Sequence, residues 1–341
     1  MRSRGIVAFA AGLAAAACSK GGTPITGPTA PPVPTYSVTA TVFYDENGNG
    51  LLDPSEATRV PGVVVAIGTG TGTSAPGSGQ AVVTGIQEGS LTAAVHADSL
   101  PAYFQAPSPL PIQVPATSTI QIPLTLPIGN NNANVYWGYG DSITAGDGSS
   151  DGQGYRLKLQ SLLGPYFARA DVQTTGRSGT FSSQGPERIR VWIAHYNPAY
   201  MLLLYGTNDW NDESCQNADP LTCYTIDSLR QMIEVAKDRD TLPVVATIIP
   251  GNPALVPPGR NTWYDQMNVG IKAMAQNEQV LVADLNAEFK AASNPASLYS
   301  DQVHPNDAGY QVMAQGWFKA ITRARSAAAS SSRRFGFSFH P

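Results

Sequence analysis

The stretch Tyr139-Gly140-Asp141-Ser142-Ile143-Thr144-Ala145 places a serine directly after an apolar run that extends from Ala133 to Gly138. An apolar run of this length predicts a buried strand. A serine just past the end of a strand is held on a rigid element with its hydroxyl accessible, which suits a nucleophile. A hydroxyl becomes a good nucleophile only when a neighbouring base removes its proton. We therefore expect Ser142 to be a nucleophile whose base lies elsewhere in the chain.

The base is sought among four histidines. Only His304 has an acid at a useful spacing, because Asp301 precedes it by three residues and one carboxylate can meet one imidazole nitrogen. His195 ends a predicted helix, where the helix dipole alone favours a histidine. His96 lies in a β-like region and His340 in the C-terminal tail. The spacing predicts that His304 is the base, that Asp301 orients it, and that the chain is a serine esterase.

Two further segments could supply hydrogen-bond donors to a developing oxyanion. The segment 170–179 reads as a short strand that runs into a turn at Gly176, and the apolar run Met201–Tyr205 is followed by Gly206 and Asn208. A glycine N–H and an asparagine amide are suitable donors. Each segment also has a purely structural interpretation, since glycine forms turns and Asn-Asp often caps the next helix.

Taken in order, these segments resemble the four motif blocks of the SGNH (GDSL-type) hydrolases. The blocks are Gly140-Asp141-Ser142-Ile143-Thr144, Gly176, Gly206-Thr207-Asn208-Asp209 and Asp301-x-x-His304, and the resemblance covers roughly residues 134–323. It implies a Ser142–His304–Asp301 triad and no catalytic cofactor. It also implies an oxyanion hole formed by the backbone N–H groups of Ser142 and Gly176 and by the Asn208 side chain.

The resemblance has one departure and one competitor. The family usually carries an asparagine two residues before the block glycine, and Thr174 stands there, which puts the loop geometry in doubt more than catalysis. The competitor is Gly148-Ser149-Ser150-Asp151-Gly152, which matches the G-x-S-x-G nucleophile motif. That motif needs a strand before it and a helix after it, whereas the preceding residues already read as a loop. We interpret the match as chance.

The C-terminal half alternates apolar strands with amphipathic helices, which predicts an α/β fold with a flavodoxin-like parallel sheet covered by helices on both faces. In such sheets ligand sites form at the carboxyl ends of the strands, where Ser142, Gly176 and Asn208 would all lie. The hydrolase domain is expected over residues 133–325. The predicted helices are Tyr155–Leu163, stopped by Gly164-Pro165, then Pro186–His195, Tyr224–Asp238, Thr262–Asn277 and one that starts near Tyr310.

The N-terminus predicts export. Residues 1–17 read as a signal peptide, with arginines, an apolar run and small residues before Cys18. Cys18 resembles the acylated cysteine of bacterial lipoproteins, although Ala15 stands where leucine is usual; plain cleavage after Ala17 is the alternative. Residues 18–35 are rich in Pro, Gly and Thr and read as a tether. We expect a lipoprotein at the outer membrane, in the periplasm or on the cell surface, or else a secreted protein.

Residues 36–128 predict a small β-sandwich of short strands that opens on alternating apolar positions. Near its start, Asp45–Glu56 matches the calcium-loop pattern D-x-[DN]-x-[DN]-G-x5-E. The flanks are not helices, so the loop resembles those of B-type repeat domains in bacterial surface adhesins and predicts a structural calcium ion. A metal-free β-turn is the alternative. The expected ligands are Asp45, Asn47, Asn49, Leu51 through its carbonyl, Asp53 and Glu56.

Composition narrows the class of protein. A net charge of −4 with 13% charged residues gives no basic patch and no support for nucleic-acid binding. Cys215 and Cys223 could form a disulfide outside the cytoplasm, or remain two free thiols. Residues 326–341 read as a disordered tail.

The sequence is least informative about the substrate. Tyr139, Tyr205 and Trp210 flank the motif blocks and either line the substrate site or simply pack in the interior. We expect short-chain acyl esters or O-acetyl groups on polysaccharides as substrates. The alternatives are a lysophospholipase- or thioesterase-like acyl hydrolase, and a calcium-dependent surface adhesion module with a vestigial hydrolase domain.

Overall fold

The computed structural model describes residues 33–217 and 219–324. The described residues from Thr35 onward belong to one compact unit. The predicted signal peptide, the lipidated Cys18, almost all of the tether and the tail 326–341 lie outside the described residues. Within the described ranges, no helix is both long and apolar enough to span a bilayer. The division into domains at residues 128 and 133 stays a prediction.

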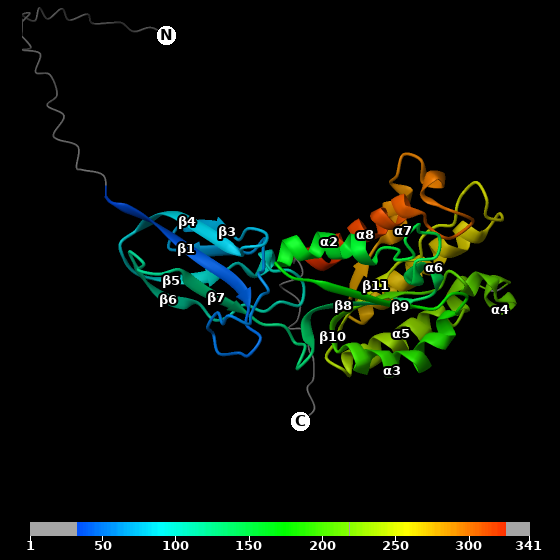
Figure 1. The fold of residues 1–341 in the computed structure, drawn as a ribbon, viewed down its shortest axis with the longest axis horizontal. Coiled ribbons are helices and arrows are strands. Elements are labelled where there is room, and N and C mark those ends of the chain that lie inside the picture. The colour runs from blue at the N-terminus through cyan, green and yellow to red at the C-terminus, as the bar shows by residue number, and fades with distance from the viewer. Residues whose placement is uncertain (1–32, 218, 325–341) are drawn as a thin grey trace, which may run out of the picture. The chain divides into compact units, whose positions relative to one another are not determined.

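A parallel sheet of five strands forms the centre of the C-terminal part (Figure 1). Its order is β12-β11-β10-β8-β9, so the first strand in sequence, β8, lies between the second and the third. This is the flavodoxin-like order, in which ligands bind where the connections diverge beside the first strand. The fold prediction is confirmed. The strands are β8 (Asn132–Gly140), β9 (Asp171–Gly176), β10 (Pro198–Leu204), β11 (Leu242–Ala246) and β12 (Leu281–Ala283).

Helices cover both faces of this sheet, because its strands are apolar on both sides. Along β10, Tyr200 and Leu202 join one hydrophobic cluster, whereas Met201 and Leu203 join the other. The first face is covered by α2 (Arg156–Phe167), α7 (Leu285–Lys290) and α8 (Asp307–Thr322), and the second by α3 (Gly185–Tyr196), α5 (Thr225–Lys237) and α6 (Arg260–Asn277). Short helices are α1 (Ser142–Ala145) and α4 (Glu213–Gln216), with 3-10 turns at Ala97–Ser99, Ser182–Gln184, Asp209–Asn211, Pro220–Thr222 and Pro295–Leu298.

The predicted end of α2 is wrong. The helix continues through Gly164 and Pro165 and ends at Phe167, before Ala168 in the left-handed conformation. A proline inside a helix removes one backbone hydrogen bond and costs about 3 kcal/mol. Leu163 and Phe167 lie four residues apart on one face and are at most 1% exposed. Burial of two large apolar side chains contributes about 3–6 kcal/mol, which equals or exceeds that cost. The sequence also gave no expectation for the short helix α7.

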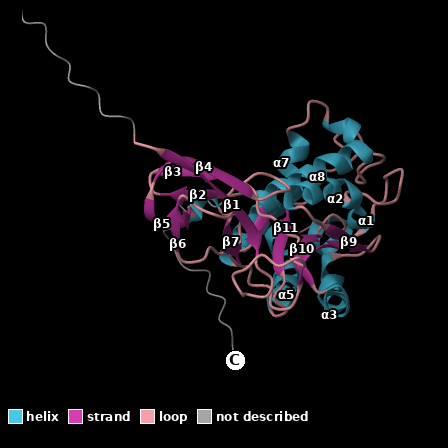
Figure 2. Ribbon diagram, turned by 60° about the vertical axis from the view of Figure 1, so that its left-hand side comes forward, coloured by secondary structure: helices cyan, strands magenta, loops and turns pink. Residues whose placement is uncertain are grey.

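The N-terminal strands form two separate sheets, seen as magenta arrows in Figure 2. One has the order β4-β1-β7 and the other β3-β2-β5-β6. The sequence gave no expectation for β6, nor for β3, whose Gly-Thr-Gly-Thr carries no apolar residue. Glycine is needed there: a Cβ on Gly72 would lie 2.4 Å from the Val82 carbonyl oxygen. The strands are β1 (Thr35–Tyr44), β2 (Val64–Ile67), β3 (Gly70–Thr73), β4 (Gln80–Gln87), β5 (Gly89–Val95), β6 (Leu110–Val114) and β7 (Ile120–Leu124).

Candidate active site

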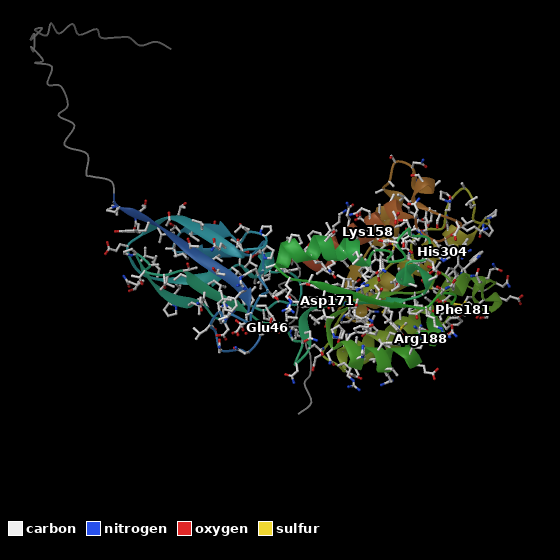
Figure 3. All side chains as sticks on the ribbon, in the orientation of Figure 1. Glu46, Lys158, Asp171, Phe181, Arg188 and His304 are labelled. Atoms are coloured by element: carbon white, nitrogen blue, oxygen red, sulfur yellow. A yellow bond between two sulfur atoms is a disulfide. The ribbon has the colours of Figure 1, made fainter. Side chains whose placement is uncertain are left out.

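The structure brings Ser142 and His304 together across 162 residues of sequence. Ser142 follows β8 and opens α1, and its Oγ lies 2.9 Å from His304 Nε2. The other ring nitrogen, Nδ1, lies 2.7 Å from Asp301 Oδ2. His304 is labelled in Figure 3, on the turn that precedes α8. An ionised carboxylate can only accept hydrogen bonds, so Nδ1 carries the proton and Nε2 is free to accept the Ser142 hydroxyl.

Asp301 is held in the ionised form that this arrangement needs. Its Oδ1 accepts the backbone N–H groups of Val303 and His304, each at 2.8 Å. Burial opposes ionisation, but the hydrogen bonds from the His304 side chain and from these two N–H groups outweigh it and lower the pKa of Asp301 below its usual value. The carboxylate therefore lies where it can orient the imidazole, and it would stabilise the protonated form of that ring.

The segment around Ser142 is fixed from two sides. Asp141 caps α1, with Oδ1 accepting the Ile143 N–H at 3.0 Å. From α8, the Tyr310 hydroxyl lies 3.0 Å from the Ile143 carbonyl oxygen and 2.7 Å from that of Asp147. Ser142 itself is only 4% exposed. A rigid surround of this kind keeps a nucleophile in one orientation.

Asp141 is completely buried, and its Oδ2 has no hydrogen-bond partner among the described residues. Burial is the largest influence and raises the pKa of Asp141; the Ile143 N–H opposes the rise, the Asp209 carboxylate adds to it, and the result is about 7. Near neutral pH this carboxyl group is therefore present in both its protonated and its charged form.

Gly176 ends β9 and pairs with Gly140 at the end of β8. A Cβ at this position would lie 2.0 Å from the Ala145 nitrogen and 2.4 Å from the Asp141 carbonyl oxygen. The backbone of the nucleophile segment therefore packs directly on Gly176, and no larger residue fits. This close approach explains a glycine that the sequence suggested only as a turn former or an N–H donor.

Asn208 follows β10, the other strand beside β8. Its Nδ2 donates to the Thr180 carbonyl oxygen at 3.0 Å, which fixes the amide and leaves a second N–H on the same nitrogen. Its side chain makes no capping hydrogen bond to the 3-10 turn that follows. The helix-capping interpretation of Asn208 is thus not what the structure shows. An oriented amide with one remaining N–H is suited to binding an oxyanion.

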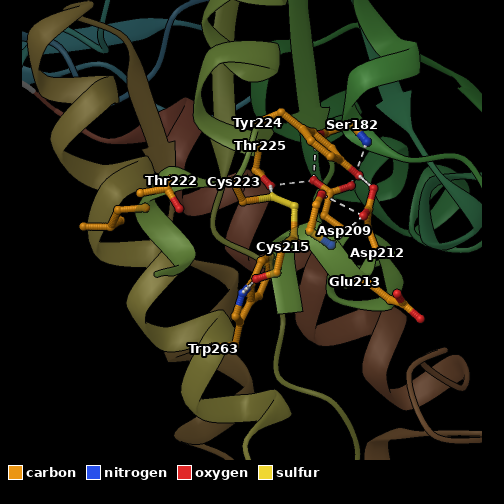
Figure 4. The surroundings of a disulfide bond; sticks show 12 residues. Ser182, Asp209, Asp212, Glu213, Cys215, Thr222, Cys223, Tyr224, Thr225 and Trp263 are labelled. Carbon is orange, nitrogen blue, oxygen red and sulfur yellow. Dashed lines mark hydrogen bonds between the residues drawn. A yellow bond between two sulfur atoms is a disulfide. The ribbon is translucent and has the colours of Figure 1, made fainter. Parts of the chain in front are cut away.

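Sequence reasoning missed the hydrogen-bonded cluster that holds the residue after Asn208. The next residue, Asp209, is buried and accepts hydrogen bonds from the Ser182 N–H (2.9 Å), the Ser182 hydroxyl (2.6 Å) and the Thr225 hydroxyl (2.6 Å), as Figure 4 shows. Burial raises the pKa of Asp209, although these hydrogen bonds oppose the rise. The only signal in the sequence was the acid itself, because nothing marked Ser182 or Thr225 as its partners.

The structure joins Cys215 and Cys223 in a disulfide, with Cα atoms 4.8 Å apart. The bond lies beside the Asp209 cluster, since Cys223 Sγ is 3.2 Å from the Thr225 hydroxyl (Figure 4). Trp263 packs near it and donates its indole N–H to the Cys215 carbonyl oxygen at 3.0 Å. The disulfide therefore closes the loop that follows the Asn208 block.

The other serines and the other histidine considered for catalysis have different partners. Ser150 donates its hydroxyl to Asp307 at 2.6 Å, and Ser149 donates to the Gly146 carbonyl oxygen at 2.7 Å, so neither serves a histidine. His195 lies in the last turn of α3 with its ring against Trp192. These positions fit the structural interpretations that the sequence favoured for them.

The two tyrosines that flank the motif blocks pack in the interior. Tyr139 and Tyr205 are fully buried; Tyr139 donates to the Gly185 carbonyl oxygen at 2.7 Å, and Tyr205 accepts from Arg188 at 2.8 Å. Trp210 is partly exposed and packs edge-on against Trp263. Of the three aromatic residues considered as a substrate wall, only Trp210 has accessible surface of any size.

The loop predicted to bind calcium is folded on its own polar groups. Asp45 accepts the N–H groups of Gly48 and Gly50, each at 2.8 Å, and Glu56 accepts those of Glu46 (2.8 Å) and Asp53 (3.0 Å). Gly50 adopts a positive φ of 76°, as the bend requires.

The remaining expected ligands of this loop are less well arranged for binding a metal ion. The amide nitrogens of Asn47 and Asn49 both donate to Asp53 Oδ2, at 2.7 and 2.8 Å. The donor set consists of the hard oxygen atoms that calcium prefers, so its chemistry fits. Across the described ranges, however, no group of three or more His, Cys, Asp or Glu side chains is placed to hold a metal. Calcium binding stays a prediction.

Comparisons with known proteins concern the α/β part. Similar solved structures include a G-D-S-L family lipolytic protein from Veillonella parvula (24% identity, 55% of this chain and 98% of that chain, TM-score 0.45) and a GDSL-like lipase from Bacteroides thetaiotaomicron (21%, 55% and 87%, TM-score 0.43). A third is an acetylxylan esterase from Geobacillus stearothermophilus (19%, 56% and 95%, TM-score 0.46). No curated protein matches the chain. The model of the GDSL-like lipase/acylhydrolase family matches residues 139–312, more than half of the 341 residues and all four motif blocks, and the chain belongs to this family.

Proposed function

We propose that the protein is a serine ester hydrolase in which Ser142, His304 and Asp301 form the catalytic triad. The observation that carries the proposal is the continuous chain of contacts from Ser142 Oγ to His304 Nε2 (2.9 Å) and from His304 Nδ1 to Asp301 Oδ2 (2.7 Å). An intact chain of contacts is not expected of a vestigial site. It therefore favours an enzyme over an adhesion module with an inactive hydrolase part.

In the proposed reaction, His304 Nε2 takes the hydroxyl proton as Ser142 Oγ attacks the ester carbonyl carbon. The carbonyl oxygen becomes an oxyanion, which accepts hydrogen bonds from the backbone N–H groups of Ser142 and Gly176 and from the Asn208 amide. The protonated imidazole then gives its proton to the leaving alcohol as the ester bond breaks. Water, activated by the same imidazole, hydrolyses the acyl-serine and restores the hydroxyl.

Short acyl chains or carbohydrate O-acetyl groups are the ester class that we favour. Polar and charged side chains border the triad: Ser178 donates to Asp147 at 2.6 Å, Arg177 is exposed directly after Gly176, and Gln302 is exposed beside Asp301. Such a border suits a polar alcohol such as a sugar better than a long hydrocarbon chain. The alternative is a thioesterase- or lysophospholipase-like activity on longer acyl groups.

Rates of hydrolysis on different esters distinguish the two classes of substrate. We would measure hydrolysis of aryl acetate, butyrate and octanoate, together with acetate release from acetylated xylan. A preference for acetate with release from xylan would establish the favoured class. A rate that rises with chain length would establish the alternative, and no hydrolysis of any ester would refute the proposed function.

We also propose, from the sequence, that the protein is exported and anchored by lipid on Cys18, and that Asp45–Glu56 binds a structural calcium ion. Neither contributes a step to the reaction. A Cys18→Ala variant should shift the protein from the membrane fraction to the soluble fraction of the cell. Mass spectrometry of the mature N-terminus distinguishes an acylated cysteine from plain cleavage after Ala17.

A further inference from the structure

The loop between β11 and α6 contacts the turn that carries the proposed base. The backbone N–H of Asn252 donates to the Gln302 carbonyl oxygen at 2.8 Å, and its Nδ2 donates to the Asp301 carbonyl oxygen at 3.3 Å. In the same place the Tyr299 hydroxyl donates to the Pro250 carbonyl oxygen. The two hydrogen bonds from Asn252 reach Asp301 and Gln302, which come shortly before His304 in the sequence. They therefore set the position of the turn.

The turn needs an external support of this kind. Asp301 and Gln302 are exposed, and the contacts of the turn with itself are local ones, such as Ser300 N–H to the His304 carbonyl oxygen at 2.9 Å. Asn252, in contrast, is only 6% exposed. An exposed turn that must hold an imidazole within hydrogen-bond distance of a serine gains its precision from buried neighbours.

Asn252 is itself fixed in one orientation. Its Oδ1 accepts the Ala254 N–H at 3.1 Å, and its carbonyl oxygen accepts the N–H groups of Leu255 and Val256, both at 3.0 Å. The preceding Gly251 is held from α6, where Asn261 accepts its N–H at 2.7 Å and donates to its carbonyl oxygen at 3.1 Å. Because Oδ1 is engaged with Ala254, the amide nitrogen must face the Asp301 carbonyl.

The same segment of chain reaches the oxyanion side of the site. In the first turns of α6, the Tyr264 hydroxyl donates to the Thr207 carbonyl oxygen at 2.9 Å, and Arg260 donates to Tyr264 at 2.7 Å. Thr207 directly precedes Asn208. Residues 250–264 therefore contact both the turn of the proposed base and the block of the proposed oxyanion donor.

We propose that Asn252 is a positioning residue: its buried side-chain amide holds the Asp301 carbonyl, next to the Gln302 carbonyl that its backbone N–H holds, at the place where His304 Nε2 meets Ser142 Oγ. The inference rests on the proposed triad and adds a residue outside the four motif blocks. Asn252 touches neither the substrate nor the reacting atoms, and it acts through the position of His304.

The test is Asn252→Asp, which keeps the size of the side chain and the Oδ1 acceptor for Ala254 but replaces the donor with an acceptor that faces the Asp301 carbonyl. A misplacement of about 1 Å can cost roughly 10²-fold in rate. We expect kcat on aryl acetate to fall roughly 10- to 100-fold with KM within about twofold. The low-field proton resonance of His304 Nδ1–H should shift or broaden.

Asn131→Asp is the matched control. Asn131 also donates its amide to a backbone carbonyl, that of Arg239 at 2.7 Å, but it lies just before the amino end of β8, far along the strand from Ser142. This variant should keep kcat and the Nδ1–H resonance. If Asn252→Asp fails to fold, Asn252→Ala, which introduces no charge, takes its place with the same expected loss and is judged by kcat per folded molecule.

Unchanged kcat and resonance in the Asn252 variants would overturn the inference, as would an equal loss in Asn131→Asp. The proposed function fails differently, by full activity of a Ser142→Ala variant. An inactive Ser142→Ala protein together with a fully active Asn252→Asp protein would refute only the role of Asn252.

Discussion

Asp141 and Asp209 are both fully buried, beside the proposed nucleophile and the proposed oxyanion donor respectively. Their carboxyl groups accept unequal numbers of hydrogen bonds. Asp209 accepts three hydrogen bonds from Ser182 and Thr225, whereas Asp141 Oδ2 has no partner among the described residues. The Asp209 carboxylate contributes to the raised pKa of Asp141. Two buried carboxylates in one cluster resist ionising together, so the proton resides on the less well solvated one.

Replacing Asp141 should change how stability depends on pH. The pKa of Asp141 is raised to about 7 in the folded protein, so the folded state retains a proton that the unfolded chain releases near pH 4. The stability that this proton contributes is present below pH 4 and is lost as the pH rises toward 7, by up to about 1.4 kcal/mol per unit. Asp141→Asn should flatten the decline, which urea unfolding between pH 4.5 and 7.5 measures. Because the pKa of Asp209 is also raised, some slope should remain; an unchanged slope would contradict the assignment.

Ser142→Ala should abolish ester hydrolysis without unfolding the protein, because the triad loses its nucleophile and the fold loses one hydroxyl. The matched control is Ser150→Ala, which removes a hydroxyl bonded to Asp307 on the exposed surface. It should retain the wild-type rate. Initial rates on aryl acetate and circular dichroism of both variants are sufficient. A reversed result, with Ser150→Ala inactive, would move the nucleophile to the competing motif.

Asn208→Ala should lower kcat by roughly 10²–10³-fold, the usual effect of removing one oxyanion donor. KM should change little, because the donor acts mainly in the transition state. Asp209 and its three hydrogen bonds remain, so the block should stay folded and the melting temperature should fall by only a few degrees. A kcat close to that of the wild type would exclude the amide from the oxyanion hole.

The rate should depend on pH through the proposed base, in a range where the Asp141 carboxyl, with a pKa of about 7, also titrates. His304 must be neutral to accept the serine proton, so a reaction that needs the neutral imidazole becomes faster as the pH rises. The pKa of Asp301 is lowered, so its carboxylate stays charged over this whole range and adds no step of its own. We expect kcat/KM on aryl acetate to rise with pH to a plateau. A flat profile from pH 5 to 8 would exclude a histidine base.

Removing calcium should affect stability and leave catalysis intact. Calcium bound to Asp45–Glu56 would stabilise the folded chain by about 2.7 kcal/mol at a hundredfold excess over Kd. Calorimetry with chelator and with calcium up to the millimolar range should therefore show a higher melting temperature with the ion. The esterase rate at 25 °C should be equal in both. Identical melting curves would leave the loop as a metal-free turn.

The sequence was sufficient to predict the parallel sheet and to identify the residues of the four motif blocks. Apolar runs predicted the parallel strands other than the edge strand β9, since a strand buried on both faces must be apolar throughout. Ser142 and His304 could be paired because a nucleophile requires a base and only one histidine had an acid beside it. Gly176 was found as a glycine in the right place, although the reason for it, the 2.0 Å approach to the Ala145 nitrogen, belongs to the fold.

Contacts between distant segments could not be predicted in this way. Asn252 lies in a Pro/Gly loop and resembles any turn former until its amide is seen beside the Asp301 carbonyl. Ser182 and Thr225 gave no sign that both would bind Asp209. The end of α2 was wrong for a related reason: Gly164-Pro165 is a local stop signal, and the burial of Phe167 that overrides it depends on tertiary packing.

The hydroxyl of Tyr310 reaches the Ile143 carbonyl oxygen from α8, the last helix of the described residues, and this has a consequence for biosynthesis. A growing chain emerges from the ribosome with Ser142 long before His304 and α8. More than 160 residues must therefore be translated after Ser142 before the proposed base, His304, and the packing residue Tyr310 have been synthesised. If Ser142 and His304 form the proposed triad, a chain that stops before His304 lacks the base and cannot hydrolyse esters.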